Sequence, residues 1–341
     1  MTSKRSSHSD SGPVIDCPAG RSYTVGMKRL VLIFLLLALL EARLFAQAPA
    51  GGTDSGNAQP PDSQSRIAVS VEVVNLLTTV TDKKNRLVTD LTKDDFRVFE
   101  DGKPQEIRYF SRETDLPLRI GILIDTSNSV RGRLGFEQDA AIDFLNEALH
   151  PGKDLAFAVS FDVEPQLLQD YTDDVEKLSD ALRGLKAGGV TSLFDAVFFA
   201  CKEKLLFRPP LEPYLRRVMI VLSDGVDNRS VHTEDEAVSM AERSEVTIFA
   251  ISTNRSGAEV KGDKVLNKLA GLTGGRAFFA FEAGDLAASF KQIASDLRSQ
   301  YTLAYVSTNP AHDGTFRQVR IRAVDPNLRV RAREGYFSLP Q

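Results

Sequence analysis

The sequence predicts an α/β protein with a doubly wound, mostly parallel sheet and a smaller β domain built from the segments that flank it. Two observations support this. Apolar runs alternate with amphipathic helical patterns in the middle of the chain, and period-two alternation marks both flanks. The chain has 341 residues, of which 42% are hydrophobic and 26% charged. This composition excludes a wholly disordered protein.

The N-terminal part has the pattern of an export signal. Residues 1–26 are polar, and we interpret them as an extension or as a start codon assigned too early. Residues 27–48 combine a basic start, an apolar run and a small-residue cleavage site, which is the order found in a secretory signal peptide. The sequence therefore predicts an exported protein that is periplasmic, on the cell surface or secreted. An anchor that stays uncleaved is the alternative.

The flanks of the central region predict β structure. Residues 49–66 are rich in Pro, Gly, Ser and Gln, which is typical of a flexible linker. Residues 67–116 alternate with period two and contain a D-G-K hairpin turn, so we expect an N-terminal β module. Residues 300–341 return to strand patterns, and we expect this C-terminal segment to pack with the N-terminal module as one domain. The α/β domain, residues 117–299, is then an insertion between them.

Apolar runs in the α/β domain predict the strands of a parallel sheet. They lie at residues 119–124, 155–161, 217–223, 246–251 and 276–281. Helical patterns lie at residues 134–149, 175–185, 193–206, 234–243, 263–272 and 286–297. Continuous apolar strands separated by helices indicate a sheet that is covered on both faces.

Charge and rare residues exclude several functions. Lys+Arg 42 against Asp+Glu 46 gives a net charge of −4, which offers no attraction for nucleic acid. The 4 His residues are scattered, so a His-built zinc site is not expected. Cys17 precedes the predicted cleavage site and Cys201 lies in a helical pattern, so the mature chain is expected to contain no internal disulfide.

Oxygen-bearing side chains follow the predicted strands. Asp125, Ser127 and Ser129 come directly after the first strand, Asp224 follows the central strand, and Thr191 lies in a G-G-V-T loop before a helix. Because the carboxyl ends of parallel strands share one edge of a sheet, we expect these side chains to meet. Carboxylates and hydroxyls suit Mg²⁺, Mn²⁺ or Ca²⁺ rather than zinc. Taken singly, the D-T-S-N-S motif would read as helix capping.

Together these motifs resemble the metal-ion-dependent adhesion site, D-x-S-x-S…T…D, of von Willebrand factor type A (VWFA) domains. The flanking motifs D-D-F-R-V-F-E-D-G-K and A-R-E-G-Y-F are similar to a bacterial group of exported proteins with a VWFA-related domain. The resemblance implies that Ser127 and Ser129 ligate the ion directly, Thr191 directly or through water, and both aspartates largely through water. It also implies that an Asp or Glu carboxylate of a protein partner fills the last position on the ion.

The sequence thus predicts an exported adhesion module, not an enzyme, that binds a divalent cation, with Mg²⁺ expected first. No catalytic residue and no organic cofactor are expected, and a membrane is involved only through the signal or an anchor. The phosphate-binding G-x-x-x-x-G-K-[ST] and nucleophile G-x-S-x-G motifs are absent from the sequence. The alternatives are a metal-dependent hydrolase or phosphotransferase, and a structural envelope protein whose metal stabilises the fold.

Overall fold

The computed structural model describes residues 73–112, 116–206, 215–254, 256, 259–280 and 283–340. The predicted extension, signal and linker (residues 1–66) lie outside these residues and stay predictions. The chain divides into two compact units, Met1–Ile67 and Ala68–Gln341, and every described residue belongs to the second. Within the described ranges, no helix is both long and apolar enough to cross a membrane.

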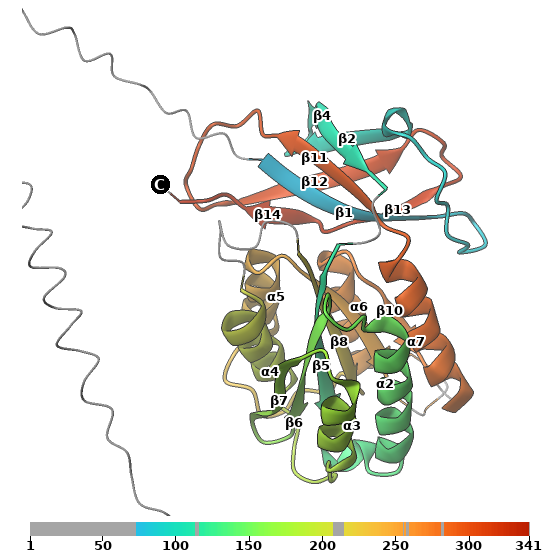
Figure 1. Cartoon of the computed structure of the whole chain (residues 1–341). Coiled ribbons are helices and arrows are strands. Elements are labelled where there is room, and N and C mark those ends of the chain that lie inside the picture. The colour runs from blue at the N-terminus through green and yellow to red at the C-terminus, as the bar shows by residue number, and fades with distance from the viewer. Residues whose placement is uncertain are drawn as a thin grey trace, which may run out of the picture. The chain divides into compact units, whose positions relative to one another are not determined.

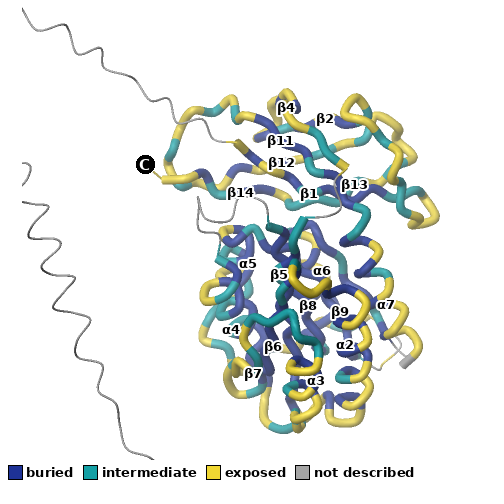
Figure 2. The backbone as a smooth tube through the Cα atoms, in the orientation of Figure 1, coloured by how far each residue is buried: buried dark blue, intermediate teal, exposed yellow. Residues whose placement is uncertain are grey.

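A six-stranded sheet lies at the centre of the α/β domain, in the order β10-β9-β8-β5-β6-β7. Its strands pair in parallel, except that β7 runs antiparallel to β6 at one edge. Every residue of β8 and β9 is buried, because helices cover both faces of the sheet (Figure 2). The strands are β5 (Leu118–Asp125), β6 (Leu155–Phe161), β7 (Pro165–Thr172), β8 (Arg216–Ser223), β9 (Val246–Ser252) and β10 (Ala277–Phe279).

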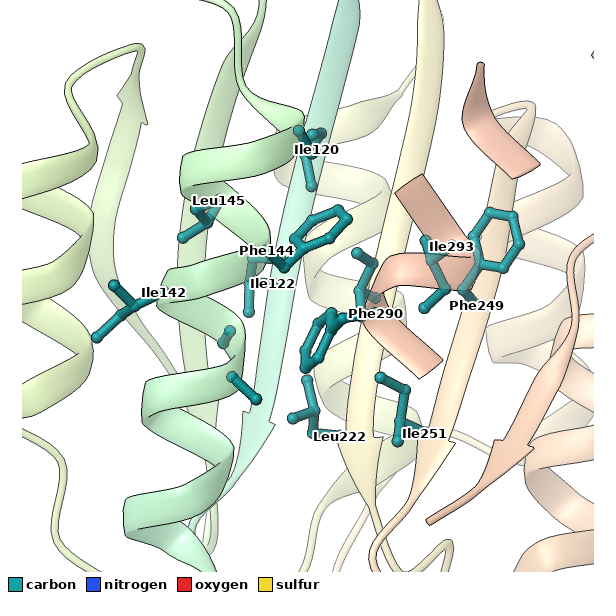
Figure 3. Packing of buried hydrophobic residues seen from close by; sticks show 14 of the residues in the cluster. Ile120, Ile122, Ile142, Phe144, Leu145, Leu222, Phe249, Ile251, Phe290 and Ile293 are labelled. Carbon is teal, nitrogen blue, oxygen red and sulfur yellow. The ribbon is translucent and has the colours of Figure 1, made fainter. Parts of the chain in front are cut away.

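Helices on the two faces of this sheet build two hydrophobic cores, and the doubly wound fold is therefore confirmed. Helices α2, α3 and α7 enclose the first core, and α4, α5 and α6 the second (Figure 1). In the first core the rings of Phe144 and Phe290 lie 5.2 Å apart beside Leu222 and Ile251 (Figure 3). The helices are α2 (Leu134–Ala148), α3 (Val175–Arg183), α4 (Leu193–Phe199, continued by a π-helical stretch at Ala200–Leu205), α5 (Glu234–Arg243), α6 (Lys261–Leu272) and α7 (Ala283–Leu297).

The two flanks of the chain combine into a β domain of two four-stranded sheets. The sheets have the orders β13-β1-β11-β4 and β14-β12-β2-β3, so each contains strands from both flanks. Leu76 and Tyr301 from the first sheet share one core with Phe96 and Val319 from the second. The smaller β domain is therefore confirmed. Its strands are β1 (Val73–Thr81), β2 (Phe96–Glu100), β3 (Lys103–Gln105), β4 (Ile107–Ser111), β11 (Tyr301–Val306), β12 (Phe316–Ala323), β13 (Arg329–Arg331) and β14 (Gly335–Phe337).

Two strand details differ from the sequence expectation. The edge strand β7 is not evident in the sequence, because Pro165 and several polar residues interrupt its apolar pattern. The expected hairpin joins β2 to β3 through Asp101 and Gly102, which both have positive φ (47° and 79°). The run that follows leaves this hairpin as β4 and pairs with β11 of the opposite sheet.

Ion pairs and a backbone hydrogen bond connect the β domain to the α/β domain. A nitrogen of Arg331 lies 2.5 Å from a carboxylate oxygen of Asp296 on α7. The Glu334 N–H donates to the Leu272 carbonyl at 3.0 Å. Asp296 is only 1% exposed, so loss of Arg331 would leave a buried carboxylate without its cation. The contact is therefore specific as well as stabilising.

Glu242 of α5 lies at the same contact and carries a perturbed carboxyl group. Burial raises its pKa to about 7, while the Arg333 charge lowers the pKa and the Glu334 charge raises it. Folding thus increases the proton affinity of this group relative to an ordinary value of 4.5.

We expect Glu242→Gln to stabilise the protein near pH 8 but not near pH 5. A raised pKa gives a stabilising contribution that is complete below the unfolded value of 4.5 and is lost as the pH rises through about 7. The gain near pH 8 should be about 1 kcal/mol after solvent screening. Urea denaturation measures it, with Glu147→Gln on the exposed face of α2 as the control. An equal effect at both pH values would contradict the prediction.

Candidate metal centre

The expected ligands lie at the carboxyl edge of the parallel sheet, where β5 and β8 end side by side. The two strands pair in register up to Ile124 and Leu222, so Asp125 and Ser223 end their strands at the same level. From β5 the sheet continues to β6 on one side and to β8 on the other. The strand order therefore reverses at β5. Where the order reverses, the loops that follow neighbouring strands run to opposite faces of the sheet, and ligands bind in the crevice between them.

Asp125 is fully buried, and both of its carboxylate oxygens are held in place. Oδ1 accepts the Ser127 N–H at 2.9 Å, and Oδ2 accepts the Ser223 hydroxyl at 2.7 Å. Ser223 is a site residue that the sequence analysis missed, although it directly precedes Asp224 in the S-D-G motif. These two hydrogen bonds fix the orientation of the carboxylate before any ion binds.

Ser127 and Ser129 point their hydroxyl groups at one another. The two oxygens lie 2.9 Å apart, so the i, i+2 spacing brings both to one point as expected. Ser127 is buried, whereas Ser129 is exposed. The serine pair therefore lies at the boundary between the buried carboxylate and solvent.

The Thr191 loop is tied to the Asp125 loop by backbone contacts. The Gly188 N–H donates to the Thr126 carbonyl at 2.6 Å, and the Gly189 carbonyl accepts both the backbone and the side-chain N–H of Asn128, at 3.3 and 3.1 Å. Gly189 has φ +82°, which favours glycine, whereas a Cβ at Gly188 would meet nothing within 4 Å. The backbone conformation of this loop thus requires glycine at position 189 but not at position 188.

Thr191 itself is buried and is positioned by Asn228. The Thr191 N–H donates to Asn228 Oδ1 at 3.0 Å, and the Asn228 N–H donates to the Thr191 carbonyl at 3.1 Å. The pairing of Asn228 with Thr191 links the loop after β8 to the loop that precedes α4, and no local sequence pattern reveals a contact of this kind.

Asp224 is the more accessible of the two aspartates. Its Oδ1 accepts the Val226 N–H at 3.0 Å, and its charge acts on Asp125. The following residue, Gly225, has φ +74°, and a Cβ there would overlap the carbonyl oxygen of Gly262 on α6. Within the described residues, neither the Asp224 carboxylate nor the Thr191 hydroxyl is hydrogen-bonded to the serine pair.

Asp195 lies in the first turn of α4, four residues after Thr191. Its carboxylate accepts the N–H groups of Val231 and His232, both at 2.9 Å, and it pairs with the His232 ring at 2.7 Å. These contacts connect the loop after β8 to α4 and use both carboxylate oxygens of Asp195.

Buried negative charge accumulates at this edge of the sheet. Burial, with a smaller contribution from the Asp224 charge, raises the pKa of Asp125 to about 6, although the hydrogen bonds from Ser127 and Ser223 lower it. Burial also raises the pKa of Glu137 on α2 to about 8, with contributions from the Asp125 and Asp224 charges. A cation would offset this charge.

The donor set fits a hard divalent cation. Carboxylate and hydroxyl oxygens are the ligands that Mg²⁺ and Ca²⁺ prefer. In the part of the chain that the structure describes, no group of three or more His, Cys, Asp or Glu side chains is arranged to hold a metal ion. A metal at this edge would therefore depend on hydroxyl groups and water as well as on the aspartates.

Comparison with known families agrees with the fold. Residues 120–226 match the family model described as the von Willebrand factor type A domain, and this range contains every expected ligand. The human protein named von Willebrand factor A domain-containing protein 3B is 28% identical over 165 residues, which is 47% of this chain and 12% of the human protein. The chain therefore contains a VWFA domain, and it spans about an eighth of that relative's length.

Solved structures that are similar to part of this chain include proteins of pili and of mussel byssus. The PilB minor pilin of Streptococcus sanguinis has a TM-score of 0.43 and 12% identity, over 54% of this chain and 62% of that one. Proximal thread matrix protein 1 of the mussel byssus, solved with a zinc-occupied MIDAS motif, has a TM-score of 0.47 and 17% identity, over 58% of this chain and 50% of that one. The vWF domain of the pili tip protein Mfa5 of Porphyromonas gingivalis has a TM-score of 0.42 and 16% identity, over 53% of this chain and 95% of that one.

We expect Gly225→Ala to destabilise the protein by about 2–4 kcal/mol, since alanine is strained at positive φ and its Cβ would overlap Gly262. The displaced backbone should also move Asp224. Gly188→Ala is the matched control, because its Cβ has free space, and its effect should stay within about 1 kcal/mol. Thermal and urea denaturation measure both, and equal midpoints for the two variants would contradict the role of Gly225.

Proposed function

We propose that the protein is an exported adhesion module, which binds a divalent cation at Asp125, Ser127, Ser129, Thr191 and Asp224 and captures an Asp or Glu side chain of a protein partner. VWFA domains are modules of adhesion and protein interaction, and this chain contains one. Export is inferred from the predicted signal at residues 27–48. We favour Mg²⁺, with Mn²⁺ or Ca²⁺ as alternatives.

The observation that carries the proposal is the serine pair beside a buried, oriented carboxylate. The Ser127 and Ser129 hydroxyl oxygens lie 2.9 Å apart. The Asp125 carboxylate is oriented by a hydrogen bond from the Ser127 N–H. Hydroxyl ligands are neutral, so an ion bound to them keeps much of its positive charge. Such an ion attracts an anionic oxygen, which a partner's carboxylate supplies.

Accessibility supports capture of a ligand from outside. Asp125, Ser127 and Thr191 are buried, whereas Asn128 and Ser129 are exposed. An ion held by these groups would have protein on one side and solvent on the other. The coordination position on the solvent side is then available to a partner.

Exposed apolar side chains on the surrounding loops favour a protein as the partner. These side chains follow the carboxyl ends of β6 and β8 or precede Thr191, and they are between 41% and 89% exposed. They are Val163, Val190, Val226 and Val231. Apolar contacts around a central polar group are typical of protein interfaces, and a small phosphoester substrate would not need them.

Metal binding provides the first test. We expect Ser127→Ala to weaken Mg²⁺ binding by about tenfold and Asp224→Ala by about 100-fold, because the aspartate supplies charge as well as an oxygen. Calorimetric titration with Mg²⁺ measures both affinities. Asp143→Ala, on the exposed face of α2, is the control. Wild-type affinity in the Ser127 and Asp224 variants would contradict the ligand assignment.

Partner capture provides the second test. The protein immobilised in Mg²⁺ should retain an envelope protein that is released by EDTA, and Asp224→Ala should not retain it. Phosphoester turnover that depends on Mg²⁺ would favour the hydrolase alternative. A melting temperature that falls with EDTA, with no partner lost, would favour a structural metal.

A further inference from the structure

Glu137 occupies a position that the pattern of its helix reserves for an apolar residue. Helix α2 buries Leu134, Ala141, Phe144 and Leu145 against the sheet, and Glu137 lies on the same stripe at helical spacing. Its exposed fraction is 0%. A glutamate in such a stripe has no packing role that leucine or methionine would not fill better, so its carboxylate needs another explanation.

Neither carboxylate oxygen of Glu137 has a hydrogen-bond partner among the residues that the structure describes. The guanidinium of Arg133, one turn earlier, is the cation that acts on Glu137. Its nitrogens donate instead to the carbonyls of Thr253 and Ala280, at 3.1 and 2.7 Å. The Thr253 hydroxyl, at the carboxyl end of β9, is also buried and has no hydrogen-bond partner among the described residues.

In addition to Arg133, two charged groups interact electrostatically with Glu137. They are Asp125 and Asp224, which are both expected ligands. Burial of an ionised carboxylate without donors is strongly unfavourable, so such a group is normally satisfied by a cation, water or a proton. Direct ligation by all three acids is not supported, because the described residues contain no three-acid group arranged for a metal. Indirect contact through metal-bound water remains, since such a water can donate a hydrogen bond to a carboxylate about 4–5 Å from the metal.

We propose that Glu137 is a third carboxylate of the metal centre, which accepts hydrogen bonds from water molecules coordinated to the divalent cation. The inference rests on the metal site proposed above. Glu137 acts as a positioning residue: its charge raises the affinity for the ion, and its oxygens orient the water that links the ion to α2. Thr253 offers a second polar group to the same water.

The test compares metal affinity with the stability of the metal-free protein. Glu137→Gln and Glu137→Met should each bind Mg²⁺ about tenfold more weakly in calorimetric titrations. Without metal, both variants should melt at the wild-type temperature or above it, because they remove a buried carboxyl group whose oxygens have no hydrogen-bond partner among the described residues. Glu147→Gln on the exposed face of the same helix should change neither quantity.

The outcomes separate this inference from the proposed function. Wild-type Mg²⁺ affinity in both Glu137 variants, together with lost binding in Asp224→Ala, overturns the role of Glu137 and leaves the metal site intact. A lower melting temperature of the metal-free variants, or failure of both to fold, also overturns it, since Glu137 would then act through the fold. Absence of Mg²⁺ binding in the wild-type protein overturns the metal site itself.

Discussion

The arrangement of this domain depends on one constraint, which is that a carboxylate ends a strand whose last six residues are all buried. Asp125 has lost its contact with water, and two hydrogen bonds, from the Ser127 N–H and the Ser223 hydroxyl, replace part of that solvation. Hydrogen bonds of this kind orient a charge but do not neutralise it. The remaining charge, increased by Asp224 nearby, needs a cation, and the hydroxyl groups at the same strand end are suited to hold one.

The loops around this carboxylate act as one assembly, because each is held by another loop. Asn128 binds the Gly189 carbonyl, and Asn228 binds Thr191 in both directions. The loops that carry the proposed hydroxyl ligands are therefore positioned by contacts within the protein that do not require an ion. In a site that is ordered before binding, little of the binding free energy is lost to ordering the loops. More of it would then contribute to the affinity for an ion and for a partner.

Much of the fold and part of the site follow from the sequence, and the rest depends on contacts between distant segments. The apolar runs predict β6 and β8 almost to the residue, since a strand buried on both faces has to be apolar. The polar edge strand β7 has no such requirement and escapes prediction. The spacing of Ser127 and Ser129 predicts their convergence, because it is a local property of a turn. The roles of Ser223 and Asn228 depend on partners 98 and 37 residues away, and no single segment encodes them.

The β domain and the candidate metal centre lie at opposite ends of the parallel strands. The chain enters the α/β domain at the start of β5 and leaves it after α7, and the contacts of the β domain involve Glu245 before β9 and Leu272 before β10. Asp125, in contrast, ends β5, whose 8 residues span roughly 26 Å. The partner proposed above would therefore meet loops that the β domain does not cover. The β domain thus contacts one end of the α/β domain and leaves the opposite end open for the proposed binding.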